Sequence, residues 1–245
     1  MASMSRLERP AFYALRPGRG RDVLTLLHPP YTAWHLSYVA IGAAVAPRLY
    51  GYRLVWTLAA FLLGMGVAAH ALDELHGRPL STGIPDRALV ALAVLSLTGA
   101  AAIGVVGAFT LSWWLLAFVV AGVVLAVGYN LELFGGRMHS DLWFALAWGA
   151  FPALTAFFAQ ALELRLDGLL VVAACTMLSL AQRRLSTPVR KLRRQTASVS
   201  GEQRLENGRT LELDAVSIAA PMEGALLACA LGMVLLAAGL VAARL

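Results

Sequence analysis

Charged residues are scarce in this chain of 245 residues. Only 14% of its residues are charged and 59% are apolar, whereas soluble domains contain about 25% charged and about 45–50% apolar residues. A water-soluble globular protein is therefore excluded. The few charges are also unevenly placed, because short polar stretches separate long uncharged ones. This pattern predicts an all-α integral membrane protein with a single polytopic membrane domain over residues 1–245.

Cysteine is scarce as well. Cys175 and Cys229 both lie in apolar runs, where a thiol usually packs as a small hydrophobe, so no disulfide framework is expected. No small-residue cleavage pattern follows the basic N-terminal segment 1–22, and we expect no removable signal peptide. The net charge of +6 does not indicate a nucleic acid partner, because the cations lie at predicted bilayer boundaries and suit anionic lipid headgroups.

The gaps between charges predict about seven membrane spans. A helix needs about 20 mostly apolar residues to cross the hydrocarbon, since each residue rises about 1.5 Å. The predicted spans are residues 31–47, 54–72, two spans within 88–131, then 142–161, 168–182 and 224–243. We expect Pro221 and Gly224 to break the entry to the last span. Residues 183–213 are expected to form a polar cytoplasmic loop.

The distribution of Lys and Arg predicts the orientation. Cytoplasmic loops collect these residues, and a cytoplasmic N-terminus assigns sixteen of the twenty to the cytoplasmic side. The outer side then keeps only Arg48, Arg53, Arg165 and Arg244. We therefore expect a cytoplasmic N-terminus and an outer C-terminus.

Most polar residues near span ends fall on that cytoplasmic side, after spans two, four and six. Residues three and four apart on a helix share a face, so His70, Asp73 and Glu74 can converge on one ligand or metal. The alternative is that the two carboxylates only end a span among the headgroups and that His70 reaches the interface from the last turn.

With these motifs the chain resembles the UbiA superfamily of intramembrane prenyltransferases. The resemblance covers roughly residues 22–165 and lies in the entry to the first span, the end of the second span and the turn between the fourth and fifth spans. These segments read Leu27-His28-Pro29-Pro30-Tyr31-Thr32-Ala33-Trp34, then Asp73-Glu74 followed by Gly77-Arg78-Pro79-Leu80-Ser81-Thr82-Gly83, and Tyr129 followed by Gly135-Gly136-Arg137 and Ser140-Asp141-Leu142-Trp143-Phe144.

The resemblance implies a fold, a reaction and a site. In the family, two facing carboxylate clusters hold Mg²⁺ against a prenyl diphosphate, whose chain passes to a lipophilic acceptor within the membrane. Membrane lipid, a prenyl diphosphate and an acceptor are thus the implied partners, with the site on the cytoplasmic side. Asp73 and Glu74 are the implied catalytic and magnesium-binding residues. The implied substrate-binding residues are Arg78, Tyr129, Asn130, Arg137 and Asp141, and the basic run after span six adds Arg183 and Arg184 as candidates.

Two departures from the family pattern limit this inference. Ala69 stands where the first motif has an Asn, and the second Asp-rich motif, after span six, has no carboxylate. Six cations lie within 183–194 in its place. Guanidinium groups bind phosphate bidentately without a metal, so one hypothesis is that these cations replace half of the metal site. The alternative is that they are an ordinary positive-inside signal.

Other functions remain open at this stage. A UbiA-derived protein without catalysis would bind a phospholipid or a polyprenyl phosphate, or serve as an accessory membrane subunit, and the missing second motif favours it. A catalyst needs Asp73 for turnover, whereas a binding protein tolerates Asp73→Asn. A small transporter is less favoured, because the spans lack the charge pairs and paired broken helices of ion-coupled sites.

Overall fold

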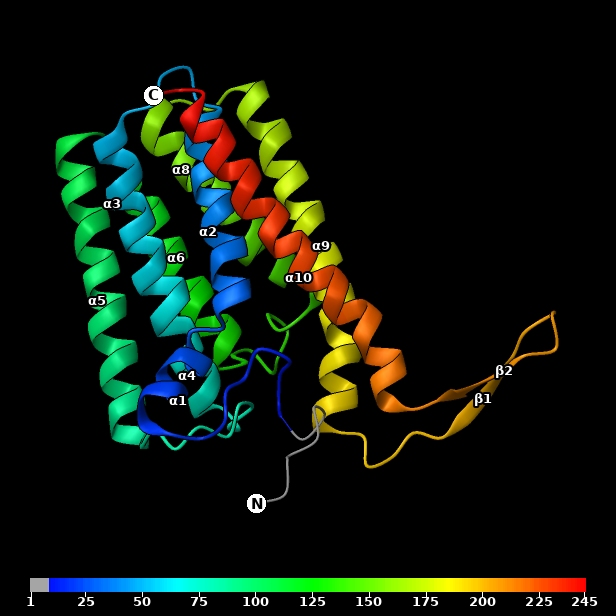
Figure 1. Cartoon of the computed structure of the whole chain (residues 1–245). Helices are drawn as coiled ribbons and strands as arrows, with labels where there is room; N and C mark the ends of the chain where they lie inside the picture. The colour runs from blue at the N-terminus through cyan, green and yellow to red at the C-terminus, as the bar shows by residue number, and fades with distance from the viewer. Residues whose placement is uncertain (1–8) are drawn as a thin grey trace.

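Long helices make up most of the chain in the computed structural model, which describes residues 9–245 (Figure 1). Two π-helical segments join shorter α-helices into continuous ones, and one antiparallel hairpin projects from the bundle. The elements are α1 (Arg19–Leu26), α2 (Pro29–Ala44), α3 (Gly51–Phe61), η1 (Leu62–Ala69), α4 (His70–Leu75), α5 (Asp86–Thr110), α6 (Leu115–Asn130), α7 (Asp141–Ala145), η2 (Leu146–Ala150), α8 (Phe151–Ala161), α9 (Leu166–Arg194), β1 (Gly201–Arg204), β2 (Thr210–Leu213) and α10 (Ala215–Ala242).

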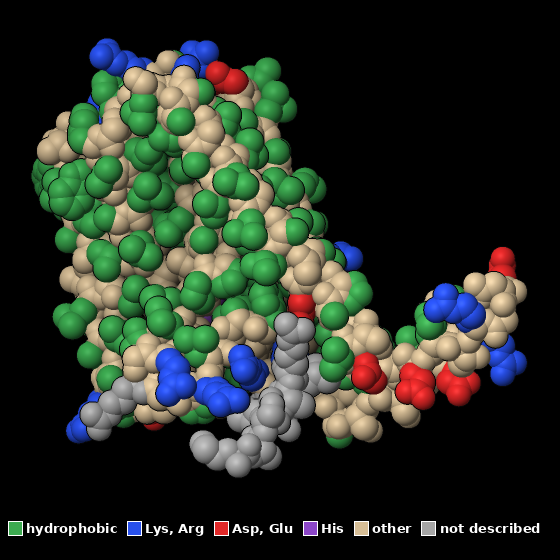
Figure 2. Space-filling view, in the orientation of Figure 1, with side chains coloured by type: hydrophobic (Ala, Val, Ile, Leu, Met, Phe, Trp, Pro, Cys, Tyr) green, Lys and Arg blue, Asp and Glu red, His purple; other side chains and the backbone are tan. Residues whose placement is uncertain are grey.

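Five continuous helices within the described residues are long and apolar enough to cross a membrane. They are Gly51–Leu75, Asp86–Thr110, Asp141–Ala161, Leu166–Arg194 and Ala215–Ala242. A wide band of hydrophobic side chains separates two ends that carry the Lys and Arg side chains (Figure 2). The prediction of a helical integral membrane protein is thereby confirmed. The helices α2 and α6 are shorter, with 16 residues each, so the count of seven spans stays a prediction.

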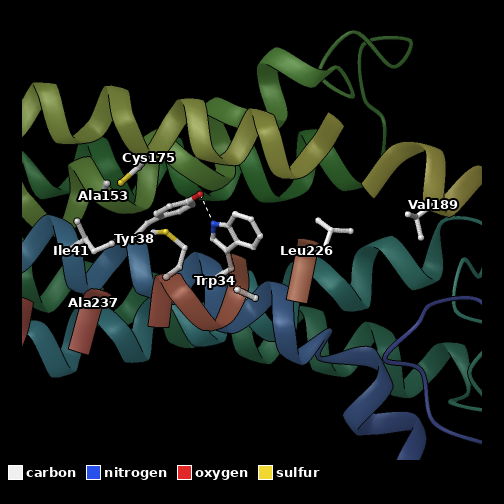
Figure 3. Close-up of a cluster of buried hydrophobic side chains, with 10 residues drawn as sticks. Trp34, Tyr38, Ile41, Ala153, Cys175, Val189, Leu226 and Ala237 are labelled. Carbon is white, nitrogen blue, oxygen red and sulfur yellow. Dashed lines mark hydrogen bonds between the residues drawn. The ribbon is translucent and has the colours of Figure 1, made fainter. Parts of the chain in front are cut away.

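The helix α2 lies in the centre of the bundle between α8 and α10 (Figure 1). Its approach to α8 requires Gly42, because a Cβ atom there would lie 2.2 Å from the Ala153 carbonyl oxygen. The indole Nε1–H of Trp34 donates to the Tyr38 hydroxyl at 2.6 Å (Figure 3). This bond satisfies polar atoms inside an apolar core. Tight packing along α2 thus fixes the position of the polar residues at its N-terminal end.

The segment 183–213 corrects the loop prediction, since α9 continues as a helix through Arg194. Its last turns bury Gln182, Arg183, Ser186 and Val189, which recur at helical spacing and give the helix an inward face. The basic residues in the last turn also suit the negative end of the helix dipole. The many charges in this segment made its amphipathic helical pattern difficult to recognise in the sequence. Because of this pattern, the basic run packs against the bundle as a helix and does not form a free loop.

The predicted break before the last span is also wrong. The helix α10 begins at Ala215 and passes through Pro221 and Gly224 without interruption. Asp214 and Ser217 form a capping box, in which each side chain bonds the other residue's backbone N–H. Such a cap satisfies two of the free N–H groups at a helix start. It therefore starts the helix at Ala215, nine residues before residue 224, where the charge gaps place the start of the last span.

Candidate functional site

A polar pocket opens at the end of the bundle that holds the N-terminal residues, α1 and α4 (Figure 1). It encloses roughly 850 Å³ including its open mouth. Its walls come from residues 10–13, which we call the strap, and from α2, η1, α4, α6, η2 and the basic half of α9. Four of the chain's five histidines line it: His28, His35, His70 and His139.

The pocket holds opposite charges that form no ion pair within the described residues. Asp73 lines it from α4, and Arg190 and Arg194 line it from α9. Among residues 9–245, none of the three has an ion-pair partner, and the Asp73 carboxylate accepts no hydrogen bond. Arg190 bonds Thr187 of its own helix, and Arg194 donates to the Pro10 carbonyl of the strap. Charges in such a place favour a ligand that pairs with them.

Two further arginines of α9 line the pocket but are held by other groups. The Arg183 Nε–H donates to Asp141 Oδ1 at 3.1 Å, and its guanidinium lies 5.2 Å from the centre of the Phe144 ring. The Arg193 guanidinium donates to both oxygens of Glu223, at 2.5 and 2.9 Å. These contacts position α9 against α7 and α10. They leave Arg190 and Arg194 as the basic groups best placed for a ligand.

Polar atoms without partners add to this picture. The Tyr129 hydroxyl and the His28 Nε2 atom are buried and have no hydrogen-bond partner among the described residues. Both residues line the pocket. A buried polar group without a partner costs about 1–3 kcal/mol. Asn130 next to Tyr129 uses its amide N–H on the Ala126 carbonyl, which leaves its side-chain oxygen as an acceptor. A bound ligand or water would satisfy these atoms.

The His28 ring stacks on the His70 ring, with centroids 4.2 Å apart and planes 10° from parallel. His28 has a left-handed backbone with φ of 46°, and it precedes Pro29, which disfavours the right-handed helical region for this residue. Its Nδ1 atom lies 2.8 Å from the Tyr13 hydroxyl of the strap. The proline pair after His28 thus ends α1 and turns this imidazole into the pocket.

Acid is expected to destabilise the fold through His28. Burial lowers the pKa of this residue well below its ordinary value of 6.5, and the neighbouring His70 and Arg194 lower it further. Below about pH 6.5 the unfolded chain binds a proton here that the folded chain does not, so stability falls as the pH falls. Thermal unfolding of the purified protein between about pH 7.5 and 5.5 should show a smaller loss for His28→Asn, since Asn tolerates the left-handed backbone. Equal losses in both proteins would contradict this assignment.

Glu74 lies outside the pocket, which corrects its prediction as a catalytic and magnesium-binding residue. Its side chain is fully buried. Its Oε2 atom accepts the Leu80 N–H at 2.9 Å, and Oε1 accepts the N–H and the hydroxyl of Thr82 at 2.8 and 2.9 Å. Adjacent residues on a helix point about 100° apart, so Asp73 faces the pocket while Glu74 faces the loop after α4. Its role is to hold that loop.

Replacing Glu74 with Gln is expected to lower the free energy of unfolding by about 2–3 kcal/mol, because hydrogen bonds to a buried carboxylate are lost. In either orientation, the amide NH2 would also face one of the two backbone N–H donors, that of Leu80 or that of Thr82. Denaturant unfolding in detergent measures the loss. The matched control is Glu163→Gln at the other end of the bundle, where Glu163 forms an exposed pair with Arg165, and this change should leave the free energy of unfolding nearly unchanged. A similar loss in both variants would contradict the role of Glu74.

Of the other predicted site residues, the pocket brings together Asp73, Tyr129, Asn130 and Arg183. The remaining ones are placed elsewhere. Arg78 pairs with Asp86 and donates to the Ile84 carbonyl. Asp141 is ion-paired with Arg183 and the exposed Arg184, and Arg137 is exposed outside the pocket.

The sequence did not indicate that the histidines of α2 and the strap line the site. It indicated a basic run that could bind phosphate, but not that Arg190 and Arg194 are the members of that run that line the pocket without an ion pair. The signal for the arginines was their spacing: Arg183, Arg190 and Arg194 recur at seven and four residues, which places them on one helix face. The sequence around His28 indicates only the entry to a span. It does not indicate that the rings of His28 and His70 stack, because the two residues are 42 positions apart along the chain.

A second, apolar pocket of roughly 720 Å³ lies beside the polar one. It is enclosed by α3, η1, α5, α6, η2 and α8. Met65 of η1 and Trp148 of η2 line both pockets, so these two side chains form the boundary. π-Helical turns are rare and occur frequently at functional sites. Here both described π-helical segments contribute a boundary residue.

The donor groups do not fit a magnesium site built from protein ligands. Within residues 9–245, no three His, Cys, Asp or Glu side chains converge in a way that would hold a metal ion. Glu74 is committed to the loop, and Asp141 is paired with two arginines. Asp73 is thus the carboxylate that remains at the pocket, and α9 offers guanidinium groups where the family has its second carboxylate cluster.

Comparisons with models of known protein families, with curated proteins and with solved structures find no match to this chain.

Proposed function

We propose that the protein is an intramembrane prenyltransferase of the UbiA type, which moves an isoprenoid chain from a prenyl diphosphate to a lipophilic acceptor. The observation that carries the proposal is the contact between a charged pocket and an apolar pocket of comparable size across Met65 and Trp148. A prenyl diphosphate has the same two parts, an anionic head and a long apolar tail. Its head would lie in the polar pocket and its tail in the apolar one.

The diphosphate is bound by the side of the pocket that α9 provides. Arg190 and Arg194 have no acidic partner among the described residues, and guanidinium groups form strong charge-assisted bonds to phosphate oxygens. The Tyr129 hydroxyl adds a buried donor that has no other partner. These groups stabilise the negative charge that grows on the diphosphate as it leaves. A magnesium clamp of two carboxylate clusters has no part in this proposal.

Asp73 acts on the other half of the reacting bond. Its carboxylate lines the pocket from α4, and it favours the positive charge that develops on the allylic carbon when the diphosphate departs. The strap contributes Phe12 and Tyr13 to the pocket wall, which limits access of water to that carbon. The pocket opens at the end of the bundle that is predicted to be cytoplasmic.

The experiment is an incubation of the purified protein in nanodiscs with labelled geranyl, farnesyl and geranylgeranyl diphosphate. Each donor is offered with an alkylphenol, a long-chain alcohol and a long-chain amine as acceptors, with and without Mg²⁺. The proposal predicts release of pyrophosphate and a prenylated product with at least one pair. Binding of a donor without release of pyrophosphate under all conditions would overturn it.

A second candidate is a non-catalytic protein that binds a phospholipid or polyprenyl phosphate, or an accessory membrane subunit. The engagement of Glu74 with its loop favours it, because the pocket then keeps one carboxylate where the family uses several. This candidate predicts binding that depends on the apolar tail and no turnover. The same incubation therefore separates the two candidates.

A further inference from the structure

We propose that His70 is the general base that removes a proton from the acceptor, an inference that rests on the proposed prenyl transfer. The acceptor would then belong to the class whose attacking atom carries a proton that must be lost. The starting observation is the gathering of four of five histidines around one pocket without a metal-binding arrangement among the described residues. Histidine placed in this way suits proton transfer.

The hydrogen bonds of His70 determine which nitrogen is basic. Its Nδ1 atom lies 3.0 Å from the Gly66 carbonyl oxygen, which only accepts hydrogen bonds, so Nδ1 carries the proton. In a neutral ring the lone pair then lies on Nε2. Nε2 makes no hydrogen bond within the described residues, and the ring lines the pocket. His70 thus offers a hydrogen-bond acceptor of fixed tautomer to a ligand.

His28 holds the ring of His70 in place by stacking. Its own Nδ1 atom faces the Tyr13 hydroxyl, which both donates and accepts, so its tautomer is not fixed in the same way. Other charged or titratable groups line the pocket with His70: Asp73 of the same helix α4, His35 of α2, Tyr129 of α6, His139 of the segment after α6, and Arg190 and Arg194 of α9. Asp73 lies one turn along the same helix face, where it favours a proton on His70.

The step balances in atoms and charge. The bond between the allylic carbon and the diphosphate oxygen breaks, and its electron pair leaves with the diphosphate toward α9. A lone pair of the acceptor forms the new bond to that carbon, and the acceptor's proton passes to His70 Nε2. The imidazolium keeps its Nδ1–H bond to Gly66 and lies near the Asp73 carboxylate. It returns the proton to water when the products leave.

The test compares His70→Asn with His76→Asn in the donor and acceptor pair that gives product with the wild-type protein. Asn keeps an N–H near the position of Nδ1, so the bond to Gly66 is retained while the base is lost. His76 is the fifth histidine; it lies outside the pocket and is exposed. Tryptophan fluorescence reports donor binding independently of turnover, because Trp148 lines both pockets.

We expect His70→Asn to lower kcat about 100-fold or more, with KM and the Kd for the donor within about threefold of wild type. The pH–rate profile should lose the limb that requires a deprotonated group, whereas His76→Asn should keep both rate and profile. An unchanged kcat in His70→Asn, or equal losses of donor binding and turnover, would overturn the assignment of His70 as the general base. If the wild-type protein releases no pyrophosphate with any pair, the proposed transfer itself fails, and the base fails with it.

Discussion

Replacing Asp73 with Asn is expected to lower kcat for prenyl transfer about 100- to 1,000-fold, the range for removing a preorganised group that stabilises transition-state charge. The carboxylate lines the polar pocket without an ion-pair or hydrogen-bond partner among the described residues, so the substitution breaks no such contact of the protein. Asn has nearly the same shape and removes only the charge. The steady-state rate of pyrophosphate release measures the loss.

The direction in which the Kd for the donor changes in Asp73→Asn distinguishes this role from metal binding. Loss of a negative charge beside an anionic ligand leaves the Kd for geranylgeranyl diphosphate unchanged or tightens it. A residue that held the diphosphate through a metal would weaken it instead. Asp167→Asn at the other end of the bundle, where Asp167 is exposed and pairs with Arg165, is the matched control. Full activity of Asp73→Asn would rule out the assigned role.

Replacing Arg190 and Arg194 together with Gln is expected to weaken binding of geranylgeranyl diphosphate about 100-fold or more. A hydrogen bond to a charged group contributes about 1.5–3 kcal/mol, and two such groups face the predicted position of the diphosphate. The single variant Arg190→Gln should weaken binding about tenfold. This single variant is easier to interpret, because within residues 9–245 Arg190 hydrogen-bonds only to its own helix, whereas Arg194 also holds the strap at the Pro10 carbonyl.

The matched control for these variants is Arg184→Gln on the same helix. Arg184 is exposed, lies outside the pocket and pairs with Asp141, so its loss should leave the Kd within about twofold. Equilibrium binding of labelled geranylgeranyl diphosphate, without acceptor, measures the Kd of all four proteins. If Arg184→Gln weakened binding as much as Arg190→Gln, the effect would come from general positive charge near the membrane rather than from a site.

The helical membrane fold could be predicted because it depends on hydrophobic length, and charge gaps locate the helices near 54–72, 88–131 and 142–161 well. Helix ends within polar sequence could not be found in this way. The extension of α9 to Arg194 depends on Ser186 and Val189 packing inward, and the start of α10 depends on the capping box at Asp214. Such local contacts have little effect on the composition of a segment, but they determine where its helix begins and ends.

The candidate site was predictable only in part, for a related reason. Asp73, Tyr129, Asn130 and Arg183 lie at span ends that meet at one end of the bundle, so topology alone brings them near each other. Glu74 is adjacent to Asp73 in sequence yet faces a loop, because the helix turns by about 100° per residue. Which neighbour faces inward depends on packing that the residue types do not encode.

The most direct test of the account is photo-crosslinking with a geranylgeranyl diphosphate analogue that carries a diazirine at the far end of its chain. Peptide mapping by mass spectrometry locates the labelled residues. The account predicts labels at Leu97, Val119 and Phe151 of the apolar pocket, and loss of labelling when unlabelled geranylgeranyl diphosphate competes. Labels on lipid-facing residues such as Leu231 and Leu235 of α10, insensitive to the competitor, would contradict a ligand that spans the two pockets.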